Sequence, residues 1–188
     1  MAILTRALRL LPLAGAVFVL CMHGLYAADT PTENQVQAVF LYNFSRFVEW
    51  PAQAFVTPND PFVIGILGSD PFGARLDEAV RNEQINGHPL TVRRFRSVAE
   101  IDNCQILFVD RSETSRLGQI VAALDHRSTL TVSQADGAAQ RGVMIQFATE
   151  NNRIRLRINV DSARASGLTI SSKLLRPAEI VGTDTREQ

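Results

Sequence analysis

The sequence of 188 residues is poor in the side chains that build metal centres, with only two cysteines and three histidines. Zinc and related metals are held by clusters of Cys, His or carboxylate ligands at short, characteristic spacings. His88 and His126 are not at ligand spacing, and no cysteine pair accompanies them. We therefore expect no metal centre and no cofactor, and interpret both histidines as structural or surface residues.

An excess of charge of one sign is also missing. Lys and Arg number 19 and Asp and Glu number 19, so no net field favours nucleic acid or an anionic membrane surface. Hydrophobic residues at 46% and charged residues at 20% are ordinary values for a globular protein. The length suits one domain with a proper core.

Motifs for nucleophilic catalysis or phosphate binding are absent. Cys104 stands at the entry of an apolar run, whereas a reactive thiol needs an exposed, electropositive niche. Ser69 has no Gly-x-Ser-x-Gly context. Gly65, Gly68 and Gly73 match neither a dinucleotide-binding fingerprint nor a P-loop, and fit a plain tight turn. The sequence therefore indicates that the protein is not an enzyme.

The first 27 residues have the composition of a secretory signal peptide. Arg6 and Arg9 precede an apolar run from Leu10 to Cys21, and the small residue Ala27 follows. The alternative is an uncleaved membrane anchor, but the run is shorter than the roughly 20 residues that a span needs. Cleavage leaves 17 bases against 19 acids, a net charge of −2, and Cys104 as the single cysteine. No intramolecular disulfide is then possible.

After residue 27 we expect one α/β domain over residues 28–188. A capping box at Thr30, Pro31 and Glu33 predicts a helix that ends before Trp50-Pro51. Its expected apolar stripe consists of Val36, Val39, Phe40, Phe44 and Phe47.

The middle of the chain alternates expected strands with expected helices. The strands are residues 62–67, 90–95, 106–109 and 130–132, and the helices are residues 72–80 and 117–124. Asp70-Pro71 is expected to cap the first of these helices. This order predicts a three-layer α/β/α sandwich with a mainly parallel sheet and helices on both faces.

A C-terminal β-hairpin is the best-specified element. Val143–Ala148 and Arg153–Ile158 alternate in hydrophobicity, and Asn151-Asn152 joins them as a two-residue turn. This turn fixes a register in which three pairs lie opposite each other: Glu150 with Arg153, Phe147 with Leu156, and Ile145 with Ile158. Gln146, Arg155 and Arg157 then share the other face, which is either solvated or packed under a helix.

The segment after the hairpin mixes apolar and basic residues with little periodicity. Asp161 is expected to begin a short helix that Gly167 ends, and Ile170–Leu175 has no firm assignment. Interfaces combine apolar anchors with arginine in this way, and the alternative is that the apolar residues close the core. Together with Trp50, the residues of this segment that we expect to bind a partner are Arg164, Leu168, Ile170, Lys173, Leu174 and Arg176.

Several blocks of the sequence resemble the YfiR family. They are Ala38–Phe44, Phe47–Pro51, Ile66–Gly73, Asn103–Val109, Asn152–Arg155, Ile158–Asp161 and Gly167–Leu175. The resemblance implies a periplasmic repressor that tends to dimerise. It would bind the periplasmic region of an inner-membrane diguanylate cyclase of the YfiN type and keep cyclic-di-GMP low. An outer-membrane lipoprotein of the YfiB type would sequester it.

The resemblance also implies disulfides, one of them at the position of Cys104. The site opposite, in the strand of residues 62–67, has no cysteine here, and neither does the hairpin, so the partners that those bridges need are missing from this sequence.

The alternative function is a periplasmic sensor domain for a small ligand. Parallel sheets bind ligands at the carboxyl ends of their strands, where Gly68 and Asp110 are expected. An acid at the position of Asp110 also simply caps a helix, which is our preferred interpretation. A pocket with convergent polar groups would favour the sensor, and a flatter surface with arginine or aromatic anchors would favour the repressor.

Overall fold

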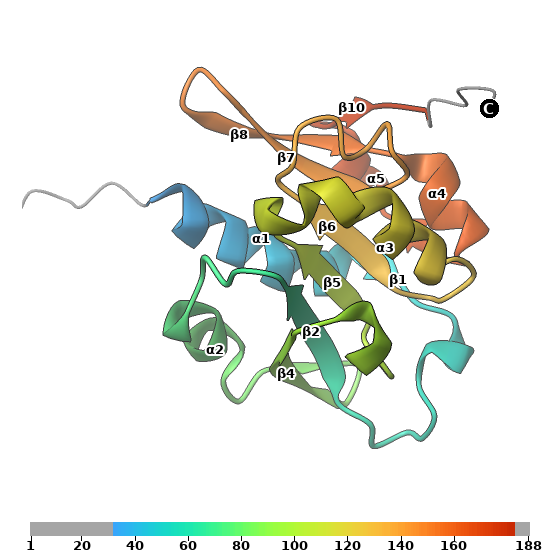
Figure 1. Cartoon of the computed structure of the whole chain (residues 1–188). Coiled ribbons are helices and arrows are strands. Elements are labelled where there is room, and N and C mark those ends of the chain that lie inside the picture. Colours follow the sequence, from blue (N-terminus) through green and yellow to red (C-terminus); the bar gives the residue numbers. More distant parts are fainter. Residues whose placement is uncertain (1–31, 183–188) are drawn as a thin grey trace, which may run out of the picture. The chain divides into compact units, whose positions relative to one another are not determined.

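The computed structural model describes residues 32–182 (Figure 1). The expected signal peptide and the predicted cap at Thr30-Pro31 lie outside these residues.

An eight-stranded sheet forms the centre of the described domain, in the order β10-β8-β7-β6-β5-β2-β4-β3. Neighbours from β4 to β7 pair in parallel, β8 runs antiparallel to β7, and β3 runs antiparallel to β4. A second, two-stranded sheet joins β1 to β9. The bounds are β1 Val48–Glu49, β2 Phe62–Leu67, β3 Gln84–Ile85, β4 His88–Phe95, β5 Ile106–Val109, β6 Leu130–Ser133, β7 Ile145–Glu150, β8 Arg153–Ile158, β9 Thr169–Ile170 and β10 Glu179–Ile180.

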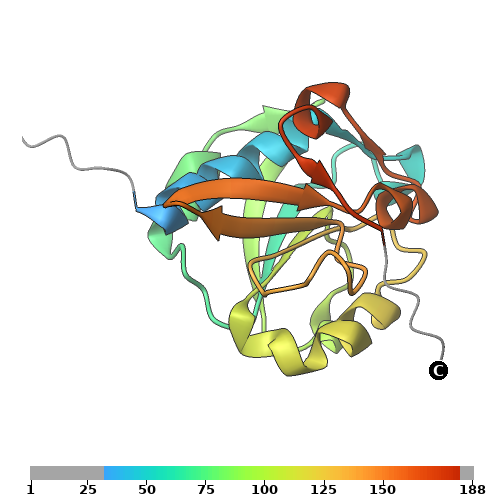
Figure 2. The same ribbon diagram turned by 90° about the horizontal axis from the view of Figure 1, so that it is seen from above.

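Helices cover both faces of the sheet, which confirms the predicted three-layer sandwich (Figure 2). Along β2, Phe62, Ile64 and Ile66 belong to the core under α1 and α2, while Val63 and Leu67 belong to the core under α3. The period-two alternation of a strand thus divides one buried run between two cores. The helices are α1 Glu33–Phe47, α2 Ala74–Val80, α3 Leu117–Ala123, α4 Val160–Ala165 and α5 Ser172–Leu175, with short 3-10 turns η1 Ala52–Ala54, η2 Val98–Glu100 and η3 Arg111–Arg116.

The N-cap of the first helix lies two residues after the predicted one at Thr30. Thr32 is the N-cap: its hydroxyl accepts from the Gln35 N–H, and the Gln35 side chain accepts from the Thr32 N–H at 2.6 Å. The predicted stripe is also partly wrong, because Val39 is 53% exposed. The buried face instead runs through Ala38, Leu41 and Phe44.

The second helix corrects another predicted cap. Asp70 accepts from the N–H groups of Phe72 and Gly73 and so closes a turn, while α2 itself begins after Gly73. Arg94 on β4 donates to Asp70 and Asp77 and ties this turn to the sheet. The hydrogen bond from Arg94 lowers the pKa of Asp77 below its ordinary value.

The hairpin has the predicted register. Glu150 pairs with Arg153, Phe147 with Leu156, and Ile145 with Ile158, and both turn asparagines have positive φ as a type I′ turn requires. The opposite face is only partly solvated: Arg155 is exposed, but the side chain of Gln146 is buried and accepts from the Ala139 N–H.

Substitutions on the two faces of β8 should have unequal costs. Leu156→Ala should lower the free energy of unfolding by about 2–5 kcal/mol, because it empties part of the core under α1. Arg155→Ala should change it by less than about 0.5 kcal/mol, because that side chain is exposed. Urea denaturation of both variants measures the difference. Equal losses would contradict the assignment of the two faces.

Cys104, two residues before β5, is buried in the core under α3 and is the free cysteine of the described residues. Its thiol donates to the Ile106 carbonyl, and burial raises its pKa to about 12. Opposite the sulfur stands Gly65, where an added Cβ would lie 2.7 Å from Sγ. Glycine therefore makes room for a thiol in a tightly packed sheet.

The thiol of Cys104 should be inert in the native protein. Thiolate is the reactive form, and burial together with the raised pKa suppresses it. A bulky maleimide at pH 8 should label the native protein at least a hundred times more slowly than the urea-unfolded protein. Comparable rates in the two states would show that the thiol is accessible.

Candidate protein-binding surface

Pairing of β1 with β9 brings together segments that are more than a hundred residues apart. Val48 lies opposite Ile170, Glu49 lies opposite Thr169, and the Ser171 N–H donates to the Phe47 carbonyl at 2.8 Å. We call these two strands the terminal ribbon. It joins the end of α1 to the start of the C-terminal segment, so the expected partner-binding residues from both segments lie in one region.

The turn after α4 directs the chain into the ribbon. The N-cap of α4 is Asn159, whose side chain accepts from the Ser162 N–H; the prediction that Asp161 begins the helix is therefore wrong by one residue. Gly167 ends it with φ +73°, and the Leu168 N–H donates to the Ala163 carbonyl. This is a glycine C-cap that turns Leu168 towards the core.

The three apolar residues of the expected binding set are core residues. Leu168, Ile170 and Leu174 are 2%, 8% and 6% exposed, and all three pack into the core under α1. Burial against the ribbon and α1 removes them from the surface. Their positions match the alternative that these residues close the core, and their role in partner binding stays a prediction.

The cationic members remain on the surface. Arg164, Lys173 and Arg176 are exposed, and the Arg164 side chain lies 3.7 Å from Asp161 with both groups at least 75% exposed. Such a pair contributes little stability. Lys173 and Arg176 form no ion pair with any residue between 32 and 182. The segment thus presents three exposed cations, and only Arg164 has an ion-pair partner among residues 32–182.

Trp50 follows β1 and is half-buried. Its indole packs edge-on to Phe62 with ring centroids 4.8 Å apart, and its Nε1–H donates to the Gln105 carbonyl at 3.1 Å. The ring is therefore fixed at one edge while part of its surface faces a groove.

The groove beside Trp50 has a volume of about 750 Å³. Its walls include Phe55 and His88, whose rings stack with centroids 3.9 Å apart, and Arg46 and Glu49 are its charged members. His88 Nδ1 contacts the Asp60 carbonyl at 2.7 Å, which fixes the ring. The sequence did not reveal Phe55 or His88 as lining residues, because both stand outside any periodic pattern.

Gln105 holds this region together. Its buried side chain accepts from the Val63 N–H and donates to the Ala54 carbonyl, and its own carbonyl accepts from Trp50. It thereby joins the start of β2, the turn η1 and the tryptophan. In the sequence, only the position of this glutamine directly before an apolar run points to this role.

The carboxyl ends of β2 and β5 were the expected place for a small ligand. The connection after β2 passes through α2 on one face of the sheet, and the connection after β5 passes through α3 on the other face. A crevice is therefore expected between the carboxyl ends of these two strands. A Cβ added at Gly68 would lie 2.6 Å from Ser112 Oγ and 2.9 Å from Glu113 Cγ. Side chains of η3 therefore fill the space beside Gly68.

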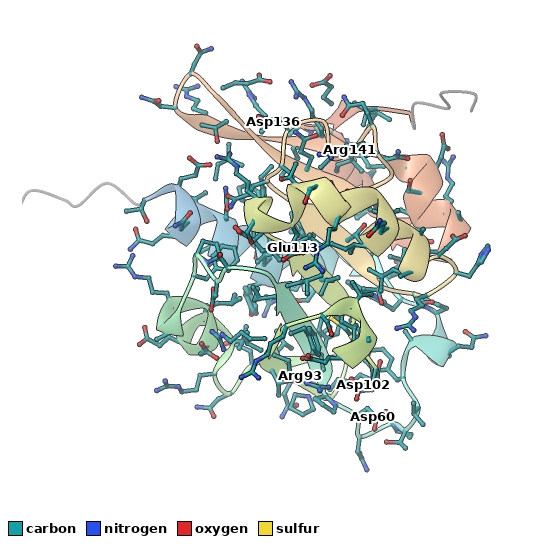
Figure 3. The ribbon with its side chains drawn as sticks, in the orientation of Figure 1. Asp60, Arg93, Asp102, Glu113, Asp136 and Arg141 are labelled. Carbon is teal, nitrogen blue, oxygen red and sulfur yellow. The ribbon has the colours of Figure 1, made fainter. Side chains whose placement is uncertain are left out.

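Asp110, at the end of β5, has a structural role. Its carboxylate accepts from the Ser112 N–H and from the Gln134 side chain, so it caps η3. Arg141, labelled in Figure 3 close to Asp136, donates to the carbonyls of Thr114 and Asp136. The loop of residues 134–142 is thereby tied to η3.

Comparison with family models matches residues 34–179 of the chain to the YfiR/HmsC-like family. The chain belongs to the YfiR/HmsC-like family. Membership indicates a periplasmic regulator of cyclic-di-GMP signalling rather than a catalyst, acting on the periplasmic region of a membrane protein. No curated protein sequence matches the chain.

Two further observations describe this YfiR/HmsC-like domain. Within residues 32–182, no three His, Cys or carboxylate side chains gather closely enough to hold a metal ion. None of the helices in that range is long and apolar enough to cross a membrane.

Trp50 should contribute only modestly to stability if its exposed side serves binding. Trp50→Phe keeps an aromatic ring on Phe62 but removes the hydrogen bond to Gln105. The expected loss is about 1–2 kcal/mol in a urea denaturation series. Phe62→Leu, deep in the core, is the reference and should cost at least as much. A loss above about 4 kcal/mol for Trp50→Phe would identify Trp50 as a core residue.

Proposed function

We propose that the mature protein is a periplasmic repressor that binds the periplasmic region of an inner-membrane diguanylate cyclase and keeps cyclic-di-GMP synthesis low. The observation that carries the proposal is the family match over residues 34–179. The proposal includes export by a signal peptide, residues 1–27, that is cleaved off, leaving a single domain over residues 28–188. It also includes sequestration by an outer-membrane lipoprotein, which would release the cyclase.

The proposed contact surface consists of Arg164, Lys173 and Arg176 together with the groove beside Trp50. Interfaces commonly combine a pocket for one apolar anchor with a rim of arginine and other polar groups. The groove offers aromatic walls for such an anchor, and the exposed cations offer partners for carboxylates. We expect the matching surface of the cyclase to carry acidic residues around an apolar side chain.

Repression requires more than tight binding. A bound protein shifts a conformational equilibrium only by the ratio of its affinities for the two states. Moving a cyclase from 99% active to 99% inactive takes a preference of about 10⁴-fold for the inactive form. The rigid placement of Trp50 by Phe62 and Gln105 favours such a preference, because a fixed side chain tolerates few partner geometries.

The sensor alternative has less support. The space beside Gly68 is filled by Ser112 and Glu113, and Asp110 is used as a cap. A ligand at the strand ends would have to displace these side chains and expose a buried carboxylate.

Charge reversal tests the proposed surface. Arg164→Glu with Arg176→Glu should leave the unfolding midpoint nearly unchanged, since exposed charges contribute little to stability. The double variant should bind the periplasmic domain of the cyclase encoded nearest to its gene at least about tenfold more weakly in calorimetry. Cellular cyclic-di-GMP should rise.

Arg96→Glu is the matched control, because Arg96 is also an exposed arginine but lies after β4, away from the ribbon. It should bind and repress like the wild type. A folded double variant that binds and represses normally would place the interface elsewhere.

A further inference from the structure

The outer edge of the β7–β8 hairpin is only partly covered. On one side β8 pairs with β7 along its whole length, but on the other side β10 pairs only with Arg157 and Ile158. From Arg153 to Arg155 no strand within residues 32–182 lies beside this edge, and the hairpin tip extends past β10 (Figure 1).

Backbone hydrogen-bonding groups point outward along this edge. The Ile158 carbonyl accepts from the Val181 N–H at 3.0 Å, so Ile158 faces the outer side. Because backbone direction alternates with a period of two, Ile154 faces the same side. An unpaired edge of this kind can receive one more strand.

The two faces beside this edge differ in chemistry. On the α1 side, a groove of about 550 Å³ is lined by Val36, Phe40 and Ile154 and bordered by four polar residues: Glu33, Thr149, Asn152 and Arg153. Glu33 accepts hydrogen bonds from Thr149 and Gln37, so its carboxylate is already engaged. The groove therefore offers an apolar floor to an incoming side chain.

The other face is cationic. Arg153 and Arg155 are exposed and form no ion pair with any described residue, whereas Arg157 is held by Glu150 and Glu179 at 2.8 Å each. The two free arginines are separated by one residue. They match carboxylates that are also separated by one residue on a neighbouring strand.

We propose that the outer edge of β8 binds an extended segment of a partner protein in which apolar and acidic residues alternate. The segment adds a strand beside Arg153–Arg155. Its apolar side chains lie over the groove of Val36, Phe40 and Ile154, and its carboxylates pair with Arg153 and Arg155.

A second copy of the chain fits this edge poorly. Antiparallel pairing of two β8 edges would bring the arginines of both copies together, and like charges on neighbouring strands are destabilising. Charged residues on an edge commonly prevent self-association in this way. The same arginines are complementary to an acidic strand.

This edge is separate from the surface proposed for the cyclase. The groove lies at the start of α1 and the terminal ribbon follows its end; 15 helical residues span roughly 22 Å. An experiment can therefore disprove one of the two proposed binding sites without disproving the other.

A synthetic peptide provides the test. Fluorescence anisotropy of a labelled octapeptide of alternating Val and Glu should show binding to the protein purified from the periplasm. The peptide with Lys in place of Glu should bind at least about tenfold more weakly. The double variant Arg153→Glu with Arg155→Glu should reverse this preference, while Arg75→Glu, an exposed arginine on α2, should leave it unchanged.

Strand addition has its own controls. Ile154→Pro removes an outward N–H and should weaken binding of the Glu peptide at least about tenfold. If that variant misfolds, two Val/Glu peptides test the same contact: one is methylated on its odd-numbered backbone nitrogens and the other on its even-numbered ones. At least one of the two peptides should lose binding. Equal binding of the Glu and Lys peptides, no binding at millimolar peptide, or unchanged binding of both methylated peptides would overturn the proposal. A homodimer in sedimentation that Ile154→Pro dissociates would show that the edge binds a second copy instead.

Discussion

The pairing of β1 with β9 is the contact on which the candidate surface depends. It is a ribbon of two residues on each side, extended by the bond from Ser171 to the Phe47 carbonyl. Val48 and Ile170 are both buried, so the ribbon closes the core at the end of α1. Without it, Trp50 and the C-terminal cations would not share one region of the molecule.

The ribbon also decides what kind of surface the protein presents. By burying Leu168, Ile170 and Leu174, it leaves the exposed cations and the groove beside Trp50 as the candidate recognition features in this region. A surface of this kind suits a reversible complex, because non-obligate interfaces are no more apolar than the rest of a protein surface. Reversibility is what a regulator needs if a second protein is to remove it from its target. The filled space beside Gly68 complements this picture, since the usual ligand position of such sheets is closed by Ser112 and Glu113.

The elements that were predicted correctly from the sequence are those whose structure depends on residues close together in the chain. The hairpin register follows from Asn151-Asn152 and the alternation on either side, and the buried strands follow from short apolar runs. The buried face of α1 differs from the predicted stripe because it includes the polar residues Gln37 and Ser45. The periodicity of apolar residues cannot reveal buried polar residues. The positions of Ile170 and Leu174 depend on pairing with a segment more than a hundred residues away. Two-residue strands and a four-residue helix have no period to detect. The groove beside Trp50, with Phe55 and His88 in its walls, depends on an irregular loop. No pattern in the sequence predicts it.

Mapping the contact by NMR tests the central claim most directly. Amide shifts of the ¹⁵N-labelled protein would be followed while the unlabelled periplasmic domain of the proposed cyclase partner is added. The account predicts that perturbed residues gather at Val48–Trp50, at Arg164, and at Ser171–Arg176. Perturbations gathered around Gly68 and Asp110, or none at saturating partner, would contradict it.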